Sequence, residues 1–563
     1  MSEWTAFDPR MRPEFDIRMQ SGFSLYPGHG NRAADRTEPS VEKRFAAATL
    51  PGGAERESLC YAPLVRIISI PCSRVVCVSF SCWRSWNTRR RWKPATGCAS
   101  LRKFWRGWSR VKPAFAAAVP RRLESAEPLR RRERRHIVNA VLSGHRLPGP
   151  SDELLAELEG IYKDIHANPE LSMQERRTSG IAAAWLRQQH YEVTEGVGGT
   201  GVVGILRNGE GPTVLLRADM DALPIKESTG LPYSSDKTGV DRFGQATSIA
   251  HSCGHDIHVA WLMGATRILA ENRDGWHGTI LAVFQPGEET AQGARAMIED
   301  GMVKRFPRPE VALAQHVMPL RAGQIGWRVG TILSAGNSYE VTLFGRGAHG
   351  SMPQKSIDPV VMAASAVMRL QTVVSREVAM TDSAVVTVGT LLAGLSENVI
   401  PDHAVLRLNV RTFKEEVRAR VLGAVKRILE AEAAASGAPK PPEFSLLSEY
   451  PLTRNDEAAT RRVVAALEDR FGKERVTEIV PATASEDFGL FGAAWNVPSV
   501  FWVIGGIDPA LYDQAKKSGR LDEIPANHAP NFAPVVDPTL RTGVEAMLSA
   551  AAAWISPAAG QPR

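Results

Sequence analysis

The segment His251-Ser-Cys-Gly-His-Asp-Ile-His258 places three imidazoles, one thiol and one carboxylate within eight residues. These are the ligand types that zinc and similar divalent metals prefer. Cys253 and His255 are two residues apart, so we expect them to point to the same side of an extended segment. A helix is predicted to follow over 259–271. Taken alone, the segment also fits a surface cluster of histidines before a helix, with one buried cysteine.

Further polar groups follow at the ends of apolar runs. Gly287-Glu288-Glu289 comes shortly after the run 279–284, and His316 follows the run 311–315. Upstream, the run 213–216 leads directly into Arg217-Ala-Asp-Met-Asp221. The carboxyl ends of strands are where α/β sheets place their chemistry. With the histidine-rich segment, these groups predict a metal hydrolase site.

The pattern of secondary structure changes twice along the chain. From Ser151, strand-like runs alternate with helical segments, which predicts an α/β fold with a mixed, mostly parallel sheet. Between 336 and 449 the order becomes β-α-β-β-α-β, the ferredoxin-like arrangement, and the first pattern then resumes. We therefore expect a discontinuous catalytic domain, formed by 151–335 and 450–563, with an inserted α+β lid or dimerisation domain over 336–449.

Residues 1–150 differ from the rest in charge. They contain 28 Lys and Arg against 12 Asp and Glu, a net charge of +16, whereas the remainder contains 40 against 49, a net charge of −9. No periodicity of 2 or 3.6 persists in them. Three interpretations stay open. The residues form a basic arm that binds nucleic acid or an anionic membrane, or they are a disordered extension, or translation truly starts near 138–142 and the residues before it are not made. This extension does not decide the function.

Cysteine usage separates the same two parts of the chain. Five of the six cysteines lie in the first 150 residues, and Cys253 is the only one after them. A disulfide framework is therefore impossible in the main body, and a reducing compartment fits. The first residues show no basic stretch followed by an apolar one, and charged residues and proline interrupt the apolar run 62–82. We expect a cytoplasmic protein without a membrane span.

The candidate metal ligands are histidines, the cysteine and one of two adjacent glutamates. They are Cys253, His255, Glu289, His316 and His528. Five ligands exceed what one tetrahedral ion with an open position accepts, so we predict two divalent ions with Cys253 as a candidate bridge. Zinc suits these ligands, and Mn, Co or Ni can replace it. We expect Glu288 to be the general base, although the glutamate pair also fits an acidic helix N-terminus.

The ordered motifs resemble the aminoacylase/hippurate-hydrolase branch of the metal-dependent amidohydrolase and carboxypeptidase family, which includes the indole-acetyl-amino-acid hydrolases. The resemblance covers about 151–556, and the first 150 residues match nothing in the family. One departure is Ala529, where the family usually has serine. The motifs that carry the resemblance are 166–171, 217–224, 251–256, 287–289, 315–317, 347–353, 398–401, 485–488 and 527–532.

The resemblance implies hydrolysis of the amide bond of N-acyl amino acids, with two Mn- or Zn-type ions on the same five ligands and Glu288 as the base. It implies that Asp221 supports the site and that His349 and Asn398 contact the small-molecule substrate. It also implies that the lid forms a homodimer or larger homo-oligomer. A dipeptidase or carboxypeptidase with the same centre is the alternative, and a catalytically idle, metal-stabilised binding protein is a rival from another class. Nucleic-acid binding is not favoured.

Overall fold

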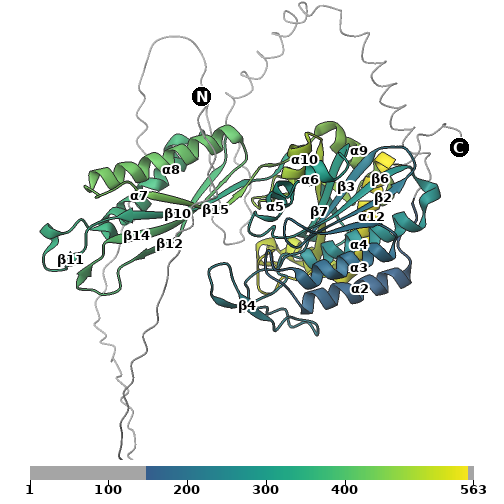
Figure 1. The fold of residues 1–563 in the computed structure, drawn as a ribbon, viewed down its shortest axis with the longest axis horizontal. Helices are drawn as coiled ribbons and strands as arrows, with labels where there is room; N and C mark the ends of the chain where they lie inside the picture. Colours follow the sequence, from purple (N-terminus) through teal and green to yellow (C-terminus); the bar gives the residue numbers. More distant parts are fainter. Residues whose placement is uncertain (1–146, 556–563) are drawn as a thin grey trace, which may run out of the picture. The chain divides into compact units, whose positions relative to one another are not determined.

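The computed structural model describes residues 147–555, and all statements about structure refer to that part of the chain (Figure 1). The basic extension predicted over 1–150 lies outside the described residues except for its last four. Of these four, Leu147 is buried in the main core. Two sheets dominate the described part, one of eight strands and one of four.

The eight-stranded sheet has the order β1-β2-β6-β3-β7-β18-β8-β17. The pairs β3–β6, β3–β7, β7–β18 and β8–β17 are parallel, whereas β1–β2, β2–β6 and β8–β18 are antiparallel. The predicted mixed, mostly parallel sheet is therefore confirmed. Its strands are β1 (Glu192–Val197), β2 (Gly201–Asn208), β3 (Thr213–Asp219), β6 (Gly278–Gln285), β7 (Val311–Arg321), β8 (Ile325–Trp327), β17 (Val476–Glu478) and β18 (Ser499–Ile507).

Helices cover both faces of this sheet because its central strands are apolar on both faces. In β3, Val214 and Leu216 join one hydrophobic core, whereas Leu215 joins the other. Figure 1 shows α2, α3 and α4 on one side of the sheet. The first core includes residues of α2 (Asp152–Ala167), α3 (Arg176–Gln188), α4 (His255–Glu271), α9 (Glu457–Phe471) and α12 (Val536–Ile555), and the second includes residues of α5 (Gly293–Glu299), α6 (Met302–Arg305) and α10 (Gly489–Trp495).

A separate core holds the four-stranded sheet, whose order is β12-β14-β10-β15 with every pair antiparallel. In β14, alternate residues from Ala404 to Val410 are buried in this core, which α7 and α8 share. We call residues 335–450 the four-stranded unit; its ferredoxin-like lid assignment stays a prediction. Its main elements are β10 (Ala335–Phe344), α7 (Pro359–Glu377), β12 (Ala384–Ala393), β14 (His403–Thr412), α8 (Glu415–Ala435) and β15 (Glu443–Tyr450).

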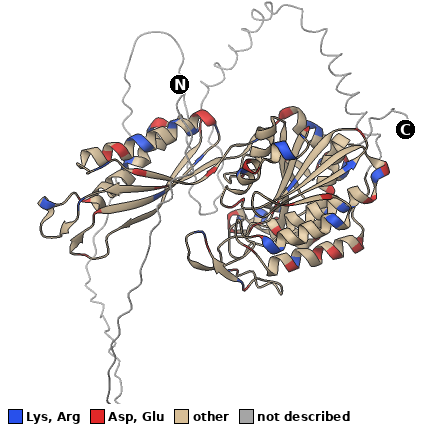
Figure 2. Cartoon of the chain, viewed as in Figure 1, with Lys and Arg blue, Asp and Glu red and all other residues tan. Residues whose placement is uncertain are grey.

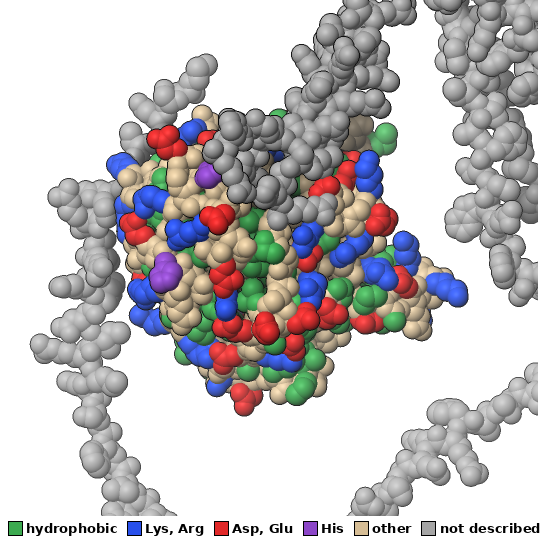
Figure 3. Space-filling view, turned by 90° about the vertical axis from the view of Figure 1, so that its right-hand side faces the viewer, with side chains coloured by type: hydrophobic (Ala, Val, Ile, Leu, Met, Phe, Trp, Pro, Cys, Tyr) green, Lys and Arg blue, Asp and Glu red, His purple; other side chains and the backbone are tan. Residues whose placement is uncertain are grey.

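Charged side chains lie mainly outside these cores. Figure 2 shows Lys, Arg, Asp and Glu along the helices, whereas the strands of the large sheet carry few of them. On the face seen in Figure 3, acidic and basic side chains are interspersed, which is typical of a solvated surface. Among residues 147–555, no helix is both long enough and apolar enough to cross a membrane.

Candidate metal centre

Three neighbouring parallel strands bring the polar motifs to one edge of the large sheet. β3 ends at Asp219, β6 ends at Gln285 just before the Glu288-Glu289 turn, and β7 carries His316. Because β6, β3 and β7 are adjacent and parallel, their carboxyl ends lie at the same edge. The sheet therefore gathers side chains that are up to about a hundred residues apart in sequence.

The histidine-rich segment forms a turn followed by the start of a helix. The prediction that this segment is extended is therefore wrong. Gly254 has a φ of 86°, and α4 begins at His255, four residues earlier than expected. A Cβ at Gly254 would lie 2.4 Å from a methyl carbon of Val317. Glycine is required there for both reasons. In this geometry His255 and His258, three apart, share one face of the first turn of the helix.

The structure brings all five predicted ligands together. Cys253, Glu289 and His528 offer ligand atoms that lie within 4.8 Å of one another. Nε2 of His255 is 3.9 Å from Oε1 of Glu289, and Nε2 of His528 is 3.2 Å from the same oxygen. His316 joins them through Nε2, which is 3.5 Å from Sγ of Cys253. The five side chains thus form one continuous group.

Two buried atoms in this group test whether a cation fits. Within residues 147–555, neither Nε2 of His255 nor Oε1 of Glu289 has a hydrogen-bond partner, although Oε1 lies 3.2 Å from Nε2 of His528. Buried polar atoms are normally satisfied, so each such atom requires an explanation. The other ring nitrogen of His255, Nδ1, is 3.1 Å from Oδ1 of Asp221, which orients the ring and leaves Nε2 free. A divalent cation held by His255 and Glu289 would satisfy both atoms.

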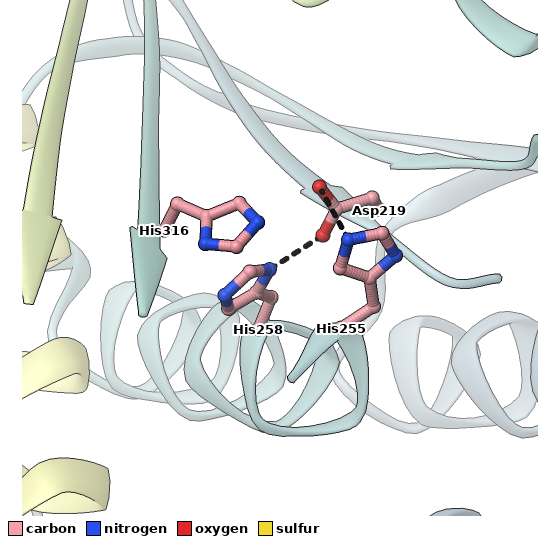
Figure 4. Close-up of side chains that lie close together, drawn as sticks. All are labelled: Asp219, His255, His258 and His316. Carbon is pink, nitrogen blue, oxygen red and sulfur yellow. Dashed lines mark hydrogen bonds and ion pairs between the residues drawn. The ribbon is translucent and has the colours of Figure 1, made fainter. Parts of the chain in front are cut away.

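His258 and Asp219 lie beside the ligands and were not predicted from the sequence (Figure 4). Nδ1 of His258 is 2.6 Å from Oδ1 of Asp219, and Nε2 accepts a hydrogen bond of 2.8 Å from the backbone N–H of Val317. Both nitrogens are occupied, so His258 supports the site and has no lone pair left for a metal. His316 differs, because the carbonyl oxygen of Val317 occupies its Nδ1, at 2.6 Å, and its Nε2 points to Sγ of Cys253, another candidate ligand.

The electrostatics of the group favour a cation. Burial alone lowers the pKa of His255, but Asp219 and Asp221 outweigh burial and raise it to about 10. Burial raises the pKa of the Cys253 thiol well above its ordinary value, and Glu289 raises it further. The surrounding carboxylates create a negative potential, which helps His255 and Cys253 to keep their protons. Metal binding would displace these protons.

Glu288 lies at the edge of a second buried acidic group with Glu486 and Asp487. Burial raises the pKa of Glu288 well above its ordinary value, and Glu486 and Glu289 add to the shift. Arg217 compensates part of this charge, since its guanidinium donates two hydrogen bonds to Glu486, of 3.1 and 2.7 Å. The sequence signal for this network was an arginine at the end of an apolar run.

Asp221 is placed as a supporting residue. Its Oδ1 is 3.1 Å from Nδ1 of His255, and its Oδ2 accepts hydrogen bonds from the Ser172 hydroxyl at 2.6 Å and from the Glu289 backbone N–H at 2.9 Å. One carboxylate therefore contacts a candidate ligand histidine and the backbone of a candidate ligand glutamate. Such partners fix the orientation of metal ligands.

The predicted substrate contacts are not brought to this group. His349 lies in the short strand β11 (Ala348–His349) and Asn398 in the loop before β13 (Val399–Ile400), and both side chains are exposed. The hydrogen bonds of His349 are local, with the backbone and hydroxyl of Ser351. Within residues 147–555, no hydrogen bond or ion pair links either residue to the candidate ligands. Their substrate role stays a prediction.

Arg411, from β14 of the four-stranded unit, was not singled out in the sequence. Its Nη1 donates to the Ser485 hydroxyl at 2.5 Å, next in sequence to Glu486 of the acidic group. Burial lowers the pKa of Arg411. Among the described residues it forms no ion pair with a carboxylate, so its charge is available to an anion. A guanidinium binds carboxylates well.

A mixed α/β sheet that gathers five metal-type ligands around a buried glutamate defines a metal-dependent hydrolase. Residues 215–526, more than half of the chain, match the peptidase family M20/M25/M40. The chain belongs to this family. The resemblance seen in the sequence is therefore confirmed.

Several characterised relatives share most of their length with this chain. An N-acetyl-L-cysteine deacetylase of Bacillus subtilis is 37% identical over 357 residues, which are 62% of this chain and 80% of the relative. A hippurate hydrolase of Campylobacter jejuni is 36% identical over 60% of this chain and 86% of the relative. The crystal structure of the YXEP protein of Bacillus subtilis, described as a dinuclear metal-binding peptidase from the M20 family, has a TM-score of 0.55 and 28% identity and covers 71% of this chain and 99% of that one.

Proposed function

We propose that this protein hydrolyses the amide bond of N-acyl amino acids and releases a carboxylic acid and an amino acid. The chain is a metal-dependent amidohydrolase of the M20 family, and its relatives include enzymes named for hippurate and N-acetylcysteine. The observation that carries the proposal is the group of five ligands beside buried Glu288, with the guanidinium of Arg411 nearby. This arrangement suits a substrate whose amide bond lies next to a carboxylate group.

The residues fit two divalent ions, held by the five ligands. Mn or Zn is the proposed metal, and Co or Ni are further options. When bound, such ions polarise the scissile carbonyl and make water a better nucleophile at neutral pH. Nε2 of His316 points to Sγ of Cys253, at 3.5 Å, and Asp221 orients His255 toward Glu289. Cys253, His255 and His316 are buried, whereas His528 is exposed.

Glu288 is the proposed general base. Its carboxylate accepts a proton from the attacking water and returns it to the leaving nitrogen. The raised pKa of Glu288, caused by burial and by Glu486, favours proton uptake at neutral pH. The hydroxyl of Tyr450 donates a 2.9 Å hydrogen bond to the backbone carbonyl of Glu288 and so fixes the turn.

We assign recognition of the substrate carboxylate to Arg411, since it is partly buried and has no carboxylate partner in the described part of the chain. His349 and Asn398 remain proposed substrate contacts, and the four-stranded unit is the proposed lid over the site. Because both residues are exposed and make no contact with the ligands of their own chain, a homodimer is the arrangement that gives them a role. A cytoplasmic location is part of the same proposal, and it is supported by Cys253, the one cysteine among residues 147–555, being a free thiol.

A dipeptidase or carboxypeptidase is the second candidate. A thermostable carboxypeptidase of Saccharolobus solfataricus is 33% identical over 61% of this chain and 84% of the relative. The two activities differ in whether the substrate has a free α-amine. A panel with blocked and unblocked substrates separates them.

The test is metal-dependent release of amino acid. The full chain is stripped with chelator, reloaded with Mn²⁺ or Zn²⁺, and assayed with N-acetyl, N-benzoyl and indole-acetyl amino acids beside simple dipeptides. We expect release from the blocked substrates only after reloading. Cleavage of dipeptides alone would support the second candidate, and inactivity on the whole panel with metal bound would contradict both.

The variant that tests the base is Glu288→Gln. Removing the proton acceptor while keeping the shape should lower kcat by about 10²- to 10⁴-fold, with the metal content unchanged by elemental analysis. Glu299→Gln, an exposed glutamate in α5, is the matched control and should retain activity. Unchanged hydrolysis by Glu288→Gln would show that another group moves the proton.

A further inference from the structure

A β-hairpin leads directly into the ligand segment. β4 (Thr238–Val240) and β5 (Ala246–Ser248) pair antiparallel. Hydrogen bonds within the turn between them, which we call the tip, hold its conformation. The carboxylate of Asp241 accepts hydrogen bonds from the backbone N–H groups of Phe243 and Gln245, at 2.8 and 2.9 Å. Gly244 supplies the positive φ of 77° that the tip requires. The tip therefore presents its side chains in a defined direction.

Both ends of the hairpin are fixed to the large-sheet part of the chain. At the tip end of β4, the side chain of Gln174 donates a hydrogen bond of 3.2 Å to the carbonyl of Val240. Ile249, just after β5, is buried in a small core with Leu171 and Ala222. Only three residues separate Ile249 from Cys253. A displacement of the hairpin would therefore be transmitted along the chain to the ligand segment.

The tip contacts the open face of the four-stranded unit. The guanidinium groups of Arg242 and Arg407 each lie 4.9 Å from the ring centre of Phe243, so the ring lies close to two cations. Arg407 belongs to β14 and is held by Glu340 at 2.8 Å. A further hydrogen bond, of 3.4 Å, runs from Arg242 to the carbonyl of Leu447 in β15. Phe243 remains 47% exposed.

The contacted face also carries Arg411. Along β14, Arg407, Asn409 and Arg411 alternate with the buried residues and so share the face away from α7 and α8. Asn409 accepts a hydrogen bond of 2.9 Å from Nε of Arg411 and donates one of 3.0 Å to the Ser338 hydroxyl. Four residues of strand, about 13 Å, separate Arg407 from Arg411. A shift of this strand would move both arginines together.

We propose that the β4–β5 hairpin is a latch that positions Arg411 for the substrate carboxylate. The ring of Phe243 contacts the guanidinium of Arg407 in β14. The base of the hairpin leads along the chain into the Cys253 segment. The latch therefore sets the distance between the carboxylate-binding strand and the candidate ligands. Phe243 and Arg407 are positioning residues, since they act through Arg411. This inference rests on the proposed function, which assigns the carboxylate to Arg411.

The test is Phe243→Ala, with kinetics on paired substrates. An N-acyl amino acid is compared with its C-terminal amide, which lacks the carboxylate. Loss of an exposed cation–π contact should raise KM for the acid about two- to fivefold, with kcat nearly unchanged and no effect on the amide. Phe243→Trp should retain the KM of the original chain, because tryptophan binds cations best. Val240→Ala, on the same hairpin and 55% exposed, is the matched control.

A double variant and a second measurement complete the test. Phe243→Ala combined with Arg407→Gln should raise KM no more than the larger of the two single changes, because both remove one contact. Amide hydrogen exchange should be faster in 403–412 of Phe243→Ala than in the original chain, whether or not the chain hydrolyses any substrate. Unchanged exchange and KM would overturn the latch, as would an equal loss on acid and amide. Absence of N-acyl activity with faster exchange would instead overturn only the proposed function.

Discussion

At the residue scale, His255 and His258 show how identical side chains acquire different roles. They lie on the same face of α4, and each has one nitrogen bonded to an aspartate. The backbone N–H of Val317 occupies the second nitrogen of His258, whereas the second nitrogen of His255 has no hydrogen-bond partner within the described residues. A metal ligand needs a free lone pair, so His255 is the candidate ligand of the two. Sequence spacing does not distinguish the two.

Another histidine, His166, yields a prediction about pH. It is buried between Asp256, at 2.6 Å, and Glu227, at 3.1 Å. Burial lowers the pKa of His166, but the two carboxylates outweigh burial and raise it to about 10. Because the folded pKa is above the ordinary 6.5, its contribution to stability is full below pH 6.5 and is lost as the pH rises through about 10.

The variant that measures this contribution is His166→Gln. Breaking a buried ion pair should lower the free energy of unfolding by on the order of 3 kcal/mol at pH 6. The difference between the two proteins should shrink as the pH approaches 10, as measured by urea unfolding at fixed metal concentration. His190→Gln, at an exposed position, is the control. A difference that is constant with pH would contradict the assignment of the proton to His166.

At the element scale, the packing of α12 against α4 depends on one glycine. A Cβ at Gly543 would lie 2.1 Å from the ring of Trp261 in α4. Trp261 is fully buried, and its indole N–H donates a hydrogen bond of 3.1 Å to the carbonyl of Thr539. The ring therefore has little freedom to move. Since α4 begins with His255, a shift of this helix would reach the metal centre.

Gly543→Ala should lower the free energy of unfolding by about 1–3 kcal/mol, the usual effect of overpacking a close-packed core. Gly160→Ala is the matched control, because open space surrounds that helical position in α2. There the better helix propensity of alanine should raise stability by up to about 1 kcal/mol. Chemical unfolding of the two variants measures both effects, and equal changes would contradict the contact.

At the scale of the whole molecule, the four-stranded unit presents apolar side chains to solvent. Val361 and Met368 in α7 are 64% and 72% exposed, and Leu392 in β12 is 57% exposed. β12 is an edge strand of its sheet, so its outer backbone groups have no partner strand among residues 147–555. An exposed edge with apolar neighbours is typical of an interface between subunits.

Leu392→Glu should therefore shift the protein from dimer to monomer, because a charge at an apolar interface is costly to desolvate. Size-exclusion chromatography with light scattering on the full chain measures the change. Leu511→Glu, at a position that is 48% exposed in α11 (Pro509–Ser518), should leave the mass unchanged. A monomeric original chain would contradict the homodimer proposal.

The sequence by itself determined the class of the large sheet and predicted the candidate ligands that the structure brings together. Apolar runs such as 213–216 and 311–315 form strands because both faces of the large sheet are covered, and this pattern is local information. The sequence also predicts different roles for the adjacent Glu288 and Glu289. What local patterns do not contain is the spatial relation between distant segments.

Only the tertiary structure decided which groups meet. Arg217 and Glu486 are 269 residues apart and bonded, and Phe243 meets Arg407 across two units of the chain. The start of α4 at His255 also depended on the tertiary structure, since the close approach of Val317 requires Gly254 at a positive φ. Contacts between distant segments depend on how sheets and helices pack, and packing is a property of the whole chain.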